Sequence, residues 1–152
     1  KHAFLFTGNT GARWLADLKK VFTTLKDYYN YPAGQIYVVS GDGPLLASDF
    51  PSATRFQVTG LDGTANTDLQ KVLGDFITAS DLQDHTSVYY FTGAIDASYN
   101  LRLGTSSLAI DPTWLANIFL DIDHSGSFAH LIMQQGYYRV LIRMLKCGFC
   151  NY

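Results

Sequence analysis

The feature that most constrains this chain is a set of four short apolar runs that alternate with segments of helical periodicity. The runs are 3–7, 36–39, 87–92 and 129–133. Runs of this length are typical of strands that are buried on both faces, and strands that alternate with helices form parallel sheets. We therefore predict an α/β fold, arranged as a three-layer sandwich with a mostly parallel sheet and helices on both of its faces.

Three segments are predicted to be helices, and in the first two the apolar residues recur at helical spacing. The second can begin at Thr64 or at Thr67, because either residue can cap a helix, and the third begins at Asp111. Residues 55–58 alternate between apolar and polar and predict a short edge strand, whereas 138–146 fit either a last helix or a strand. The predicted helices are 12–29, 64–79 and 111–121.

Length and composition limit the classes of function. The chain of 152 residues is predicted to form a single domain, 1–152. Charged residues make up 16% and the net charge is −2, which argues against nucleic acid as a partner. No apolar run approaches the roughly 18 residues of a membrane span, so no membrane insertion is expected. The chain opens at Lys1 without an initiator Met, which suggests a processed, exported protein at the cell surface or outside the cell, with the cytoplasm as the alternative.

The candidate metal and cofactor motifs are weak. Cys147 and Cys150 form one C-x-x-C near the end of the chain, which favours a small disulfide or two thiols over a redox or metal site, because a structural zinc ion needs four ligands. Residues 121–126 resemble half of a calcium loop, but Ile132 stands where a bidentate Glu is required. No glycine-rich phosphate-binding motif occurs. We expect no metal and no cofactor.

Tyrosine is unusually frequent, with ten residues that cluster in the sequence. A tyrosine ring suits both core edges and interfaces, because it has an apolar body and a polar tip. A sheet covered by only three or four helices cannot hide all ten rings, so we expect some of them to form a contact surface. The tyrosines predicted to form an interface are Tyr28, Tyr29, Tyr31, Tyr99, Tyr137, Tyr138 and Tyr152.

Two strand ends carry a resemblance to a known family. Residues 88–93 read VYYFTG, and residues 130–135 read HLIMQQ. These segments resemble the third and fourth core strands of caspase, metacaspase and legumain-like cysteine peptidases, which end at the catalytic His and Cys. Residues 17–43 and 60–65 are similar to the first half of bacterial legumain-like domains. The resemblance covers about residues 3 to 140 and implies a caspase-like sheet.

The two catalytic positions depart from the family pattern, because Ala94 follows Gly93 and Gly136 follows Gln135. In this family a thiolate attacks the scissile carbonyl and an imidazole supplies a proton to the leaving amine. Alanine cannot transfer a proton and glycine carries no nucleophile, so the resemblance implies a pseudoenzyme without catalytic residues. The chain also ends soon after the fourth strand, short of the family's final strands.

Three functions remain open after the loss of this dyad. The first is a structural module that assembles with copies of itself into an oligomer or filament, because an uncovered sheet edge invites pairing. The second is a pseudoenzyme that binds a peptide or protein in the remnant cleft, through residues Thr92, Gly93, Gln134, Gln135 and Gly136. The third is an enzyme of different chemistry that uses Asp42, His85 or Asp96.

Overall fold

The computed structural model describes residues 1–80, 86–98, 100–104, 108–111, 113–115 and 128–135. Its centre is a sheet of five parallel strands in the order β3-β2-β1-β4-β7. The α/β class and the parallel sheet are therefore confirmed. The strands are β1 (His2–Thr7), β2 (Ile36–Ser40), β3 (Thr54–Gln57), β4 (Thr86–Gly93) and β7 (Phe128–Gln135).

All four predicted core runs are strands of this sheet and lie next to one another. The segment predicted as a short edge strand forms β3, which pairs with β2 at one edge of the sheet. Two further strands, β5 (Leu101–Arg102) and β6 (Ala109–Ile110), form a separate antiparallel pair. They were not expected from the sequence, and they matter for the site described below.

The helical segments follow the prediction in part. Helix α1 (Ala12–Thr23) continues into the π-helical turn η1 (Thr24–Tyr28), and a 3₁₀ turn, η2 (Ala33–Gln35), leads into β2. Helix α2 (Leu69–Ser80) begins later than either predicted cap, Thr64 or Thr67. The cause is Asp68, whose Oδ2 accepts hydrogen bonds from the N–H groups of residues 63, 64 and 65 and so holds this segment as a loop.

The third predicted helix lies only partly within the described residues. Residues 113–115 are helical, and the Trp114 N–H donates a 2.7 Å hydrogen bond to Asp111 Oδ1. Asp111 is thus the predicted helix cap. The segment 116–121, like the segment 138–146 that could be helix or strand, lies outside the described residues.

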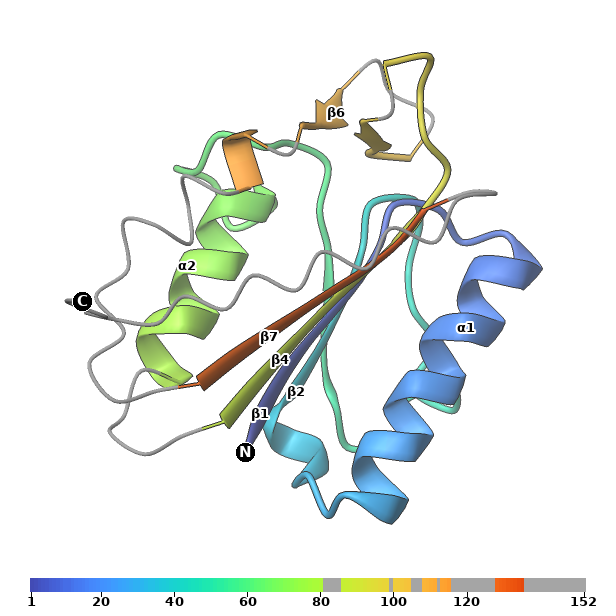
Figure 1. Ribbon diagram of the computed structural model, residues 1–152, viewed down its shortest axis with the longest axis vertical. Helices are drawn as coiled ribbons and strands as arrows, with labels where there is room; N and C mark the ends of the chain where they lie inside the picture. Colours follow the sequence, from blue (N-terminus) through green and yellow to red (C-terminus); the bar gives the residue numbers. More distant parts are fainter. Residues whose placement is uncertain (81–85, 99, 105–107, 112, 116–127, 136–152) are drawn as a thin grey trace, which may run out of the picture.

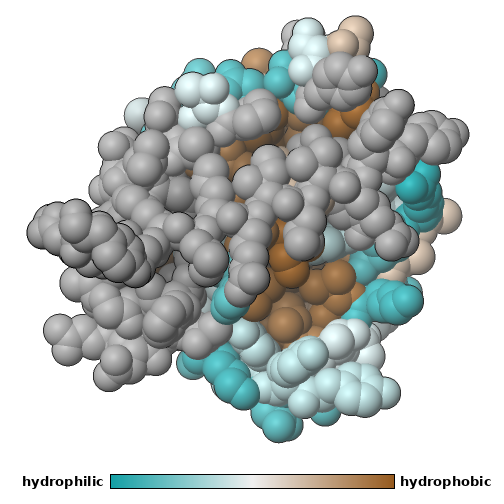
Figure 2. Space-filling model, viewed as in Figure 1, coloured by the Kyte–Doolittle hydropathy of each residue, from teal (hydrophilic) through white to brown (hydrophobic). Residues whose placement is uncertain are grey.

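Two separate core clusters lie on the two sides of β1. Phe4 and Phe6 belong to a cluster with Leu73 and Phe76 of α2, whereas Leu5 belongs to a second cluster with α1. This division follows from strand geometry, because successive side chains point to opposite faces of a sheet. Figure 1 shows α1 and α2 on opposite sides of the sheet. In the same view, Figure 2 shows hydrophobic residues near the middle of the molecule and mostly hydrophilic residues toward its rim.

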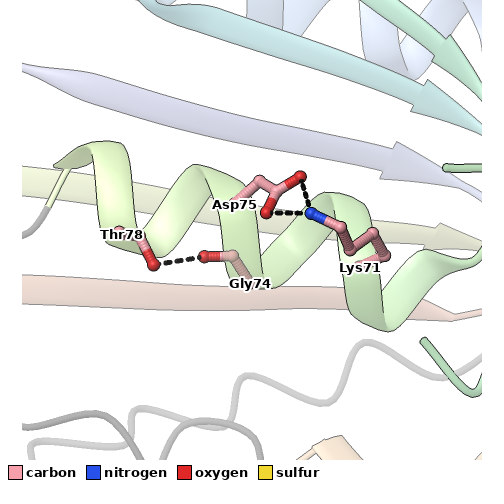
Figure 3. A network of polar contacts seen from close by, with 4 residues as sticks. All are labelled: Lys71, Gly74, Asp75 and Thr78. Carbon is pink, nitrogen blue, oxygen red and sulfur yellow. Dashed lines mark hydrogen bonds and ion pairs between the residues drawn. The ribbon is translucent and has the colours of Figure 1, made fainter. Parts of the chain in front are cut away.

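The solvent side of α2 is stabilised by local polar contacts (Figure 3). Lys71 and Asp75 form an ion pair four residues apart, and the Thr78 hydroxyl donates a 3.0 Å hydrogen bond to the Gly74 carbonyl oxygen. Apart from the backbone of α2 itself, no atom of the described residues lies within 4 Å of where a Cβ atom on Gly74 would stand. Gly74 is therefore a position where a side chain can be added without a clash.

Candidate functional site

At the carboxyl ends of the strands, the residues of the sheet change from apolar to polar. One register position is apolar in all five strands, and the next is polar in all five. Because the buried strands of an α/β sheet are apolar, this change marks the edge at which such sheets place their ligand sites. The apolar row is Phe56, Val39, Phe6, Phe91 and Met133, and the polar row is Gln57, Ser40, Thr7, Thr92 and Gln134.

The position where the sheet's connections change direction lies between β1 and β4. The chain leaves β1 toward α1 and β2 on one side, while β4 lies on the other. Two hydrogen bonds join the loops at this point: the Gly8 N–H donates to the Thr92 carbonyl oxygen, and the Ala94 N–H donates to Asn9 Oδ1, both at 2.9 Å. A ligand crevice is expected here in open α/β sheets.

A segment of the chain itself lies over these strand ends. Residues 101–104, which we call the strap, are tied to both loops by backbone hydrogen bonds. The Arg102 N–H donates to the Ala94 carbonyl oxygen at 2.9 Å, and the Gly104 N–H donates to the Gly8 carbonyl oxygen at 2.6 Å. The Leu101 and Leu103 side chains are only 0% and 2% exposed, so the strap is part of the core.

The strap packs against three glycines: Gly8 and Gly41 directly follow β1 and β2, and Gly93 is the last residue of β4. A Cβ atom on Gly8 would stand 2.0 Å from the Arg102 carbonyl oxygen. A Cβ on Gly41 would stand 2.7 Å from Leu103 Cδ1, and one on Gly93 would stand 3.0 Å from Leu101 Cδ1. The strap thus packs directly against the backbone at the carboxyl ends of these three strands, where open α/β sheets place their ligands.

The predicted binding residues do come together at the ends of neighbouring strands. Thr92 is the register partner of Gln134, and Gly93 is the register partner of Gln135. The Thr92 side chain is fully buried, however, and Gly93 is also buried. The expectation that these two residues contact a bound peptide is therefore corrected. The side chains of Gln134 and Gln135, and all of Gly136, lie outside the described residues.

Ala94, which the resemblance predicts to stand at the first catalytic position, is held by two hydrogen bonds of its backbone at this site. Its N–H donates to Asn9 Oδ1 and its carbonyl oxygen accepts from Arg102. The residues that precede the two predicted dyad positions, Gly93 and Gln135, are paired in register. The Ala94 side chain, however, is a methyl group, which cannot transfer a proton.

Asp96, a candidate for different chemistry, stabilises a turn. Its Oδ1 accepts hydrogen bonds from the N–H groups of Ser98, at 2.8 Å, and Asn100, at 2.9 Å. The hydrogen bond from the Asn100 backbone is the main reason that the pKa of Asp96 is lowered, and a lowered pKa suits a turn carboxylate better than a general base at neutral pH. His85 lies outside the described residues, and no group of three metal-ligating side chains occurs among the residues that are described.

The tyrosines predicted to form an interface divide into two classes. Tyr28 is 79% exposed and Tyr29 is 59% exposed, at the end of η1. Tyr31 is only 7% exposed and packs in the core cluster of α1, so its assignment to an interface is wrong. The other members of the set, Tyr99, Tyr137, Tyr138 and Tyr152, lie outside the described residues, as do Cys147 and Cys150.

The strap and the role of Asn9 were not predicted from the sequence. The alternation in Leu101-Arg102-Leu103, directly before Gly104, is the signal that could have revealed a short buried strand. The Asn9 side chain has no comparable signal, because its role depends on the loop after β4.

Comparison with known proteins adds no assignment: no family model matches the sequence, and neither the curated proteins nor the solved structures contain a significant match. Among the described helices, none combines the length and the apolar character that crossing a bilayer requires.

Proposed function

We propose that this chain is a catalytically inactive α/β domain, related to the caspase and legumain-like peptidases, that serves as a structural module and associates with copies of itself. The observation that carries the proposal is the strap. It packs against the ends of β1, β2 and β4, and Arg102 of the strap donates a hydrogen bond to the backbone of Ala94, which the resemblance places where the family has its catalytic His. Because the domain packs its own chain at this position, the ends of these strands contribute to the stability of the fold and do not bind a ligand.

The lack of catalytic groups supports the same proposal. Ala94 offers no proton donor or acceptor in its side chain, and Gly136 would offer no nucleophile. The burial of Thr92 and Gly93 makes the alternative, a pseudoenzyme that binds peptides at this point, the weaker account.

Self-association is supported by what the surface exposes. The large aromatic rings of Tyr28 and Tyr29 are exposed to solvent. Their apolar surface would be removed from water by contact with a partner, which is favourable. The net charge of −2 offers little repulsion between copies.

Two measurements on the purified protein test the proposal. Sedimentation velocity at micromolar concentration should show a dimer or larger assembly, and digestion of a peptide library should show no cleavage. Cleavage that a thiol-reactive probe abolishes would contradict the loss of activity, and a monomer at all concentrations would contradict the structural role.

A further inference from the structure

We draw no further inference here: the strongest candidate, an anion site at the N-terminus of α1 beside the buried Thr92 hydroxyl, rests on the helix terminus alone, because no contact among the described residues places that hydroxyl at the exposed first turn.

Discussion

Replacing Gly8 with alanine tests the role of the strap. The added Cβ would stand 2.0 Å from the Arg102 carbonyl oxygen, and this atom belongs to the backbone, so no side-chain rotation relieves the clash. A carbon and an oxygen in contact normally lie about 3.3–3.6 Å apart, so the strap must move by roughly 1.3 Å. The φ angle of Gly8 is not in the left-handed region, and the expected effect is therefore steric.

The cost follows from the contacts that this shift disturbs. Overpacking of a filled site costs about 1–3 kcal/mol. The hydrogen bonds from Gly104 to Gly8 and from Arg102 to Ala94 contribute about 1 kcal/mol each and are weakened. We expect the free energy of unfolding to fall by about 3 kcal/mol and the melting temperature by about 6–12 °C in a domain of this size.

Gly74→Ala is the matched control, because no atom of the described residues outside the backbone of α2 lies within 4 Å of the added Cβ atom. Figure 3 shows this position on α2. Alanine is the better helix former, so this variant should gain about 0.5–1 kcal/mol. Gly41→Ala should fall between the two, since the neighbour is the end of a flexible leucine side chain. Urea titrations of the three variants measure these differences. A Gly8→Ala variant within about 0.5 kcal/mol of the wild type would refute the account of the strap.

Three further predictions concern other parts of the domain. Asp68→Ala should lower the free energy of unfolding by about 1–2 kcal/mol in urea titrations, because three backbone N–H groups of residues 63–65 lose their acceptor. Burial raises the pKa of the Tyr90 hydroxyl above its ordinary value of 10.0. The neutral side chain therefore stabilises the fold below pH 10, and this contribution to the free energy of unfolding is lost as the pH rises through the folded pKa. In urea titrations from pH 8 to above 10, Tyr90→Phe should reduce this loss. Tyr31→Ser should cost about 3 kcal/mol because the ring is in the core, whereas Tyr28→Ser should change the monomer's thermal stability by less than about 0.5 kcal/mol.

The sequence by itself determined the strands and the class of the sheet. Each of the four runs is too apolar to lie anywhere except between covering layers, and strands of that kind pair in parallel. Strand geometry also determined that Tyr89 and Tyr90 point to opposite faces, and they belong to different core clusters. Asp111 was predictable as a helix cap because capping involves only the next few residues.

The start of α2 and the burial of Tyr31 depended on contacts that local patterns do not record. Thr64 and Thr67 are both acceptable caps, but the Asp68 carboxylate binds the backbone of the preceding loop and delays the helix. Tyr31 stands in the same tyrosine cluster as Tyr28 and Tyr29, yet the turn after η1 brings it into the core cluster of α1.

The closure of the candidate site was decided by the tertiary structure alone. Gly8, Gly41 and Gly93 each read as an ordinary turn residue, and only the sheet brings them together beneath the strap. The spacing of apolar residues within one helix or strand predicts which of its faces is buried, because this spacing involves only residues that are close together in the sequence. Which segment fills a crevice depends on shapes contributed by several strands at once, and those shapes exist only after the sheet has formed.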